Sequence, residues 1–104
     1  MSKQKLDDSL FELKFAAKQM RKESEKLAKD EAKEKNLAAA ALKKGQQAVA
    51  QTHAVNAIQS KNVSLQMLQM SSKVDGCAKR LEMAMRLNKV SESMTGIVGS
   101  LSVG

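Results

Sequence analysis

Histidine and cysteine are the side chains best suited to nucleophilic or metal chemistry, and each occurs once in this chain. His53 and Cys77 lie 24 residues apart in an uninterrupted helical pattern, which separates them by about 36 Å along a helix axis. They therefore cannot act as a base and a nucleophile, or share a metal ion, within one subunit. We interpret His53 as a polar helix residue and Cys77 as a small core residue, with no second cysteine for an intrachain disulfide.

Phosphate-binding loops and paired catalytic carboxylates are also missing from the sequence. The five glycines stand at positions 45, 76, 96, 99 and 104, without the spacing of a phosphate-binding loop. The acidic residues are interleaved with lysines, which is typical of ion pairing on helix surfaces. We therefore predict that the chain is not an enzyme and has no cofactor, no metal site and no small-molecule substrate.

Anion binding is the chemistry that the sequence favours. The formal net charge is +7, from 18 Lys and Arg against 11 Asp and Glu. On a helical wheel, one row of lysines falls within an arc of about 120°, roughly opposite the apolar residues. With the neighbouring arginine, this basic face comprises Lys14, Lys18, Arg21, Lys22, Lys26, Lys29 and Lys33. Such a surface favours lipid headgroups, nucleic acid or an acidic protein as its partner.

The two aromatic residues of the chain, Phe11 and Phe15, point from the same arc as the lysines. Rings flanked by lysines suit a membrane interface, where the cations contact phosphates and the rings reach the acyl boundary. The rings would equally suit docking against a neighbouring subunit. A row of lysines can also be an ordinary solvated face, supported by ion pairs such as Glu25 with Lys29.

The elements that carry these residues are predicted to be helices. Alanine is abundant, proline is absent and no strand-like alternation persists, which indicates an all-α fold. Helix one is predicted over residues 9–43, beginning at a capping box of Ser9 and Glu12. A turn is predicted over residues 44–46, where Gly45 can close the helix, and helix two over residues 47–98, with a frayed tail over residues 99–104. Two long helices joined by a short turn form an antiparallel hairpin, here a single unit of residues 1–104.

Helix two is predicted to overhang helix one and to carry two apolar stripes on different sides, of which a two-helix hairpin can bury only one. The first stripe comprises Ala50, Ala54, Ile58, Leu65 and Leu68. The second comprises Val63, Met67, Met70, Val74, Cys77, Leu81 and Met85. Unburied stripes indicate either a bundle truncated from a larger domain or a subunit that assembles with copies of itself. We assign the assembly interface to Phe11, Phe15, Met67, Met70, Val74, Met83, Leu87, Val90 and Met94.

The sequence also bears on the cellular compartment. No apolar stretch approaches the about 20 residues that a transmembrane helix needs. The N-terminal residues MSKQKLDDS lack the apolar core of a signal peptide. These features predict a cytoplasmic protein.

Three segments resemble, in order and spacing, motifs of the ESCRT-III subunits called charged multivesicular body protein type one. They are LFELKFAAK at residues 10–18, HAVNAI at residues 53–58 followed by Lys61 and Asn62, and MSSKVD at residues 70–75. The resemblance covers about residues 8–100, although Val55 and Gln59 stand where relatives tend to carry charged residues. It implies a non-enzymatic, cytosolic subunit, peripheral on endosomal membranes, that self- or co-assembles into filaments on anionic membranes.

The resemblance further implies a role in membrane remodelling and scission, in multivesicular-body sorting and in cytokinesis. Family members recruit a disassembling AAA ATPase through a C-terminal leucine- and arginine-rich motif. These 104 residues stop around the start of the family's third helix, so that partner is expected only if the motif exists beyond them. The alternative is a basic helical coiled-coil module that binds nucleic acid or an acidic protein, although two aromatic residues provide little for stacking on single strands.

Overall fold

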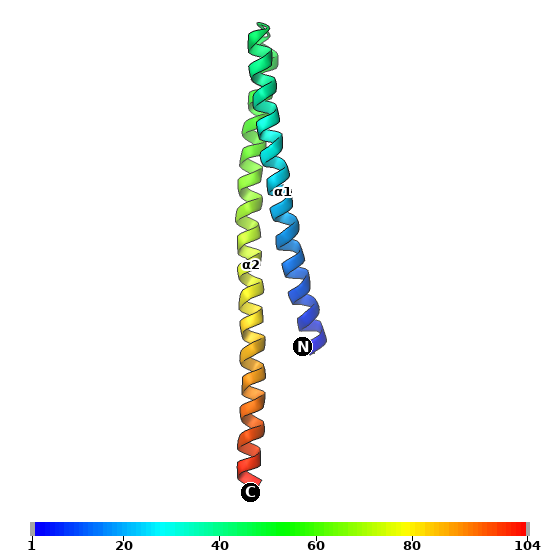
Figure 1. Cartoon of the computed structure of the whole chain (residues 1–104), viewed down its shortest axis with the longest axis vertical. Coiled ribbons are helices and arrows are strands. Elements are labelled where there is room, and N and C mark those ends of the chain that lie inside the picture. Colours follow the sequence, from blue (N-terminus) through cyan, green and yellow to red (C-terminus); the bar gives the residue numbers. More distant parts are fainter. Residues whose placement is uncertain (1, 104) are drawn as a thin grey trace.

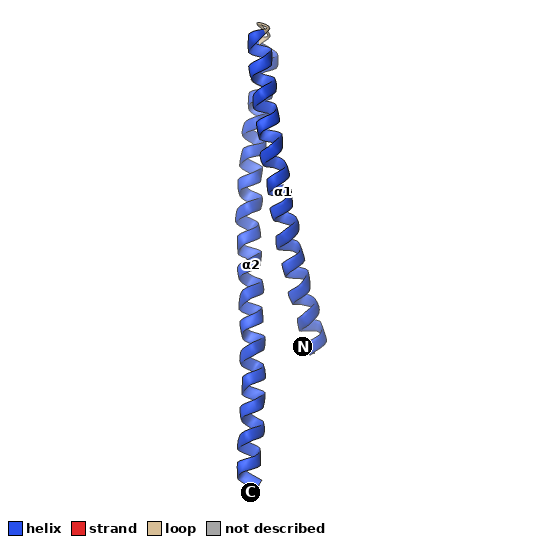
Figure 2. Cartoon of the chain, viewed as in Figure 1, coloured by secondary structure: helices blue, strands red, loops and turns tan. Residues whose placement is uncertain are grey.

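The computed structural model describes residues 2–103, which form two long helices joined by a tight turn (Figure 1; Figure 2). The first helix, α1, spans Lys3–Lys43, and the second, α2, spans Gln47–Val103. The helices run antiparallel in a rod with extents of 89 × 16 × 14 Å, and α2 continues well past the start of α1 (Figure 1). The predicted all-α hairpin with an overhanging second helix is confirmed.

The start of α1 differs from the sequence prediction. The helix begins at Lys3, and its N-cap is Ser2, whose hydroxyl accepts a hydrogen bond from the backbone N–H of Lys5 at 3.3 Å. Ser9 therefore lies inside the helix and does not form the predicted capping box with Glu12. Nothing between Ser2 and Ser9 interrupts a helix, so the helix extends to the earlier of two possible caps.

The end of α2 also differs from the prediction. The helix continues to Val103, so residues 99–103 of the predicted frayed tail are helical, whereas Gly104 lies outside the described residues. Each interior glycine disfavours the helix by about 1 kcal/mol, which is too little to end it. A positive φ angle, which does end helices, occurs among the described residues only at Gly45.

The turn is built by a Schellman motif around Gly45. Its φ angle is 74°, and its N–H donates to the carbonyl of Leu42 at 3.0 Å. The N–H of Gln46 donates to the carbonyl of Ala41 at 2.9 Å. These two bonds satisfy carbonyls that the last turn of α1 leaves open, and they reverse the chain within three residues.

A seam of side chains holds α1 against α2, and its residues recur at alternating intervals of three and four. In α1 the buried and half-buried residues at these intervals are Leu6, Leu10, Leu13, Ala17, Met20, Ser24, Leu27, Glu31, Glu34, Ala38 and Ala41. In α2 they are Ala50, His53, Ala57, Ser60, Ser64, Met67, Ser71, Val74, Ala78, Leu81 and Met85. A repeat that averages 3.5 residues is the signature of a coiled coil.

Small residues occupy every seventh position of the α2 side of this seam. They are Ala50, Ala57, Ser64, Ser71 and Ala78, and none is more than 8% exposed. The Ser71 hydroxyl donates to the main-chain carbonyl of Ala17 at 2.8 Å, and the Ser64 hydroxyl donates to that of Ser24 at the same distance. A side chain this short reaches the opposite backbone only if the two helices approach closely.

The seam takes residues from both predicted stripes of α2. Ala50 of the first stripe and Met67, Val74, Leu81 and Met85 of the second face α1. The other residues of both stripes are exposed: Ala54, Ile58, Leu65 and Leu68 of the first, and Val63, Met70 and Cys77 of the second. The prediction that Cys77 is a core residue is wrong, because its side chain is exposed. It lies on the flank of the seam next to Ala78, which is the residue that packs against α1.

Candidate functional site

The basic face lies on the side of α1 that is turned away from α2, because Leu13, Ala17 and Met20 occupy the seam. All seven of its cationic residues are exposed. Lys14 forms an ion pair with Glu82 at 3.2 Å, which ties this end of α1 to α2. Within residues 2–103 the other six cations form no ion pair, and the pair of Glu25 with Lys29 is not formed. Most of the positive charge is therefore available to an external anion.

Phe11 and Phe15 form a stacked pair on this face, as their four-residue spacing allows. Their ring centroids are 6.3 Å apart, with an interplanar angle of 16°. Phe11 is 70% exposed and Phe15 is 53% exposed, so neither ring contributes to the seam. Two rings exposed beside unpaired lysines form an amphipathic surface rather than a uniformly solvated one.

The nine predicted assembly residues divide into two groups. Besides the two phenylalanines, the exposed ones are Met70, Met83, Leu87, Val90 and Met94. Met67 and Val74 are half-buried in the seam against α1, so they stabilise the hairpin and are not part of its exposed surface. The distinction follows from the seven-residue repeat of small side chains, which places the seam along α2.

Among the exposed apolar residues that the predicted assembly interface leaves out, three belong to the first stripe of α2. Ile58, Leu65 and Leu68 belong to the first stripe, of which the hairpin buries only Ala50, and each of the three is exposed. Both stripes are apolar, so periodicity alone makes each of them a candidate for the core. The alanines and serines at intervals of seven were the signal that could have identified the buried side.

His53 has a definite structural partner. Its Nδ1 lies 2.5 Å from Oε2 of Glu34, and both side chains are about a quarter exposed. The pair fills the seam near the turn, where the neighbouring seam residues Ala50 and Ala57 have short side chains. This contact agrees with the interpretation of His53 as a polar helix residue.

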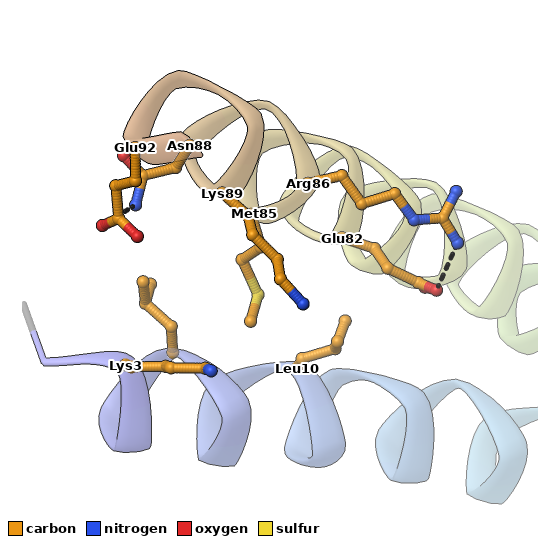
Figure 3. Close-up of a pocket in the computed structure, with 9 residues that line it drawn as sticks. Lys3, Leu10, Glu82, Met85, Arg86, Asn88, Lys89 and Glu92 are labelled. Atoms are coloured by element: carbon orange, nitrogen blue, oxygen red, sulfur yellow. Dashed lines mark hydrogen bonds and ion pairs between the residues drawn. The ribbon is translucent and has the colours of Figure 1, made fainter. Parts of the chain in front are cut away.

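The seam opens toward the N-terminus of α1, where the two helices diverge (Figure 1). A groove of about 370 Å³ lies there, with Leu6, Leu10 and Met85 among its lining residues. Figure 3 shows Met85 pointing from α2 toward α1 and Leu10 pointing toward α2, with Lys3 and Lys89 near the rim. On the α2 side, Arg86 contacts Glu82 at 3.6 Å (Figure 3). This end of the hairpin therefore has less packing between its helices than the end near the turn.

Clusters of metal-binding side chains are absent from the described part of the chain: no three His, Cys, Asp or Glu residues come together there. Likewise, no helix within residues 2–103 is both long enough and apolar enough to span a membrane.

Comparison with known proteins identifies relatives of this chain, although no family model matches it. Charged multivesicular body protein 1 of Dictyostelium discoideum is 38% identical over 96 residues, which are 92% of this chain and 50% of that protein. Charged multivesicular body protein 1a of Danio rerio is 35% identical over 96 residues, 92% of this chain and 48% of that protein. The chain belongs to the charged multivesicular body protein 1 family, an ESCRT-III family.

This charged multivesicular body protein 1 homologue spans about half the length of the curated relatives that it matches. A shorter alignment gives higher identity: charged multivesicular body protein 1b of Danio rerio is 45% identical over 73 residues, 70% of this chain and 37% of that protein. The family resemblance stated from three sequence motifs is thereby confirmed.

Proposed function

We propose that this chain is a structural, non-enzymatic subunit of the ESCRT-III type. It assembles with itself or with related subunits on anionic membranes, and it takes part in membrane remodelling and scission during multivesicular-body sorting and cytokinesis. The observation that carries the proposal is the basic face of α1, with six exposed cations that lack an ion pair in the described chain and two stacked rings at its N-terminal end. Family membership supports it, since the relatives are named after the multivesicular body.

The basic face provides two kinds of attraction to a lipid surface. Each lysine or arginine near an anionic leaflet contributes about 1 kcal/mol of binding free energy. The rings of Phe11 and Phe15 add apolar burial where the headgroups meet the acyl chains, and they already point outward. Because these groups lie on one face of α1, they can reach a lipid surface together.

The cellular setting and partners of the proposal follow from the same argument. The protein acts as a peripheral subunit on the cytoplasmic side of endosomal membranes, beside other ESCRT-III-type subunits. A disassembling AAA ATPase is a partner only if the protein carries the family's C-terminal leucine- and arginine-rich motif, which residues 1–104 do not contain.

A charge-reversal variant tests the membrane part of the proposal. The triple variant Lys22→Glu, Lys26→Glu and Lys29→Glu is mixed with vesicles of graded anionic lipid content at physiological salt, and bound protein is measured by sedimentation. Losing three contacts of about 1 kcal/mol each weakens binding about a hundredfold or more, because every 1.4 kcal/mol is tenfold. Circular dichroism should show unchanged helicity, since all three lysines are exposed.

The matched control reverses three exposed lysines elsewhere, Lys5, Lys73 and Lys89, and so brings the net charge from +7 to the same +1. We expect this control to bind vesicles much more tightly than the basic-face variant. Equal binding by both variants would contradict a localised membrane site. If the native chain ignores vesicles but binds duplex or single-stranded nucleic acid with a steep salt dependence, the basic face serves nucleic acid instead.

A further inference from the structure

The exposed side of α2 carries two apolar segments along a single face. The near segment is Ala54, Ile58, Leu65 and Leu68, and the overhang segment is Met83, Leu87, Val90, Met94, Ile97 and Leu101. Leu65 and Met83 are 18 residues apart, which is five turns of about 3.6 residues. The two segments therefore lie on the same side of the helix, and their large residues are 45–76% exposed.

The spacing of the two segments is mirror-related. Forward from Ala54, the near segment advances by four, seven and three residues, through Ile58 and Leu65 to Leu68. Backward from Leu101, the overhang segment repeats these intervals, through Ile97 and Val90 to Leu87. Two copies of α2 laid antiparallel would thus place each of these near-segment residues opposite an overhang residue of the other copy.

We propose that two copies of this chain pair antiparallel along α2, so that the overhang segment of each covers the near segment of the other. The inference rests on the proposed function, because this pairing is a contact between two subunits of the proposed assembly. In this register Ile58 faces Ile97 of the second copy and Leu65 faces its Val90. A two-fold axis relates the copies, so each contact occurs twice.

The centre of the pairing face offers independent support at Gly76. A Cβ placed there would meet only Arg80 Nη1, at 3.6 Å, which is ordinary contact with the end of a flexible side chain. The backbone at Gly76 has no positive φ angle, so nothing in the hairpin requires a glycine. In the antiparallel pair, Gly76 lies against Lys79 of the second copy and leaves room for its aliphatic stem.

Charges at this centre are self-complementary. Asp75 and Lys79 pair within each chain at 3.4 Å and remain partly exposed. Antiparallel pairing brings Asp75 of one copy beside Lys79 of the other, and the symmetry repeats this contact. Opposite charges therefore meet where the two chains cross, whereas a parallel pair in register would place like charges together.

A second copy fits the overhang segment better than a lipid surface does. From Met83 to Leu101 the charged residues are Arg86, Lys89 and Glu92, and Arg86 forms an ion pair with Glu82 at 3.6 Å. An interfacial membrane helix carries lysines and arginines beside its apolar face, and in this chain that arrangement is on α1. The overhang segment therefore has two cations, one of them paired, whereas the basic face of α1 has seven, of which six form no ion pair in the described chain.

Disulfide trapping in solution, without lipid, tests the pairing and its direction. In a Cys77→Ser background, one variant carries Leu65→Cys and the other, bearing a size tag, carries Val90→Cys. The two proteins are denatured, mixed, refolded and oxidised, and the products are separated by size. A disulfide needs Cα atoms within about 7 Å, and only the antiparallel register brings positions 65 and 90 together.

We expect a disulfide between the tagged and untagged chains, and little self-linking of either variant. Within the pair, identical positions lie about 37 Å apart, the length of 25 helical residues. The matched control replaces Val90→Cys by Ser91→Cys, which turns the thiol off the face and should abolish the link. Self-linking of the Val90→Cys chain, which indicates a parallel pair, or no linking at all, would overturn the proposal.

Sedimentation equilibrium of the untrapped chain provides a second measure. Ile97→Ser should weaken self-association by tenfold or more, because each pair loses two apolar contacts. Lys22→Glu, on the other helix, should leave self-association unchanged. If the chain binds vesicles but forms no disulfide between positions 65 and 90, only the pairing is overturned. If the disulfide forms but the chain does not bind vesicles, only the proposed membrane function is overturned.

Discussion

Replacement of Ser71 tests whether small side chains set the separation of the two helices. Ser71 is 1% exposed, and its hydroxyl donates to the carbonyl of Ala17 at 2.8 Å. Ser71→Ala removes one buried hydrogen bond, which costs about 1 kcal/mol of unfolding free energy. Ser71→Leu removes the same bond and also forces extra atoms into a closely packed seam, which adds about 1–3 kcal/mol.

The expected total for Ser71→Leu is therefore about 2–4 kcal/mol. For a chain of this size, 1 kcal/mol lowers the Tm by about 4–8 °C, so the Tm should fall by roughly 8–30 °C. The assay is a thermal melt followed by circular dichroism at 222 nm. All variants are compared at one protein concentration, because self-association makes the Tm depend on concentration.

The control for this prediction is Ser91→Leu, which makes the same substitution at an exposed position of the overhang. We expect its Tm to stay within a few degrees of the native value, because nothing there is overpacked. If Ser71→Leu melts at the native temperature, the helices can separate at no cost and the close seam is refuted. A larger loss for Ser91→Leu than for Ser71→Leu would mean that the overhang, and not the seam, determines the stability.

Two further predictions concern the turn and the aromatic pair. Gly45→Ala should destabilise the hairpin by about 1–2 kcal/mol, because its φ angle of 74° is unfavourable for a residue with a Cβ. Gly96→Ala, where a Cβ meets open space in a helix, should not lower the Tm and serves as the control. Replacing Phe11 and Phe15 together by serine should weaken vesicle binding severalfold with little change in Tm, since both rings are exposed. Vesicle binding that is unaffected by this double change would remove the rings from the proposed membrane surface.

The sequence alone determined that the fold is all-α and that α1 carries a row of lysines opposite its apolar residues. Alanine-rich segments without proline favour long helices, and Gly45 stands between them where a tight reversal is possible. The lysine row of α1 and its opposing apolar residues, including Leu13 and Ala17, follow directly from helical periodicity. Neither feature requires knowledge of a distant contact, and both are found in the structure.

The choice between the two faces of α2 was decided by the tertiary structure. Periodicity marks both stripes as apolar, but it does not say which one meets α1. The register of the hairpin places Ser64 opposite Ser24 and Ser71 opposite Ala17, and hydroxyl-to-carbonyl bonds then fix a short distance between the backbones. Small side chains therefore alternate with Met67, Val74 and Leu81 along the seam, and Ile58, Leu65 and Leu68 remain outside. Shape complementarity between residues 40 and 54 positions apart, and not local hydrophobicity, determined which surface the protein presents.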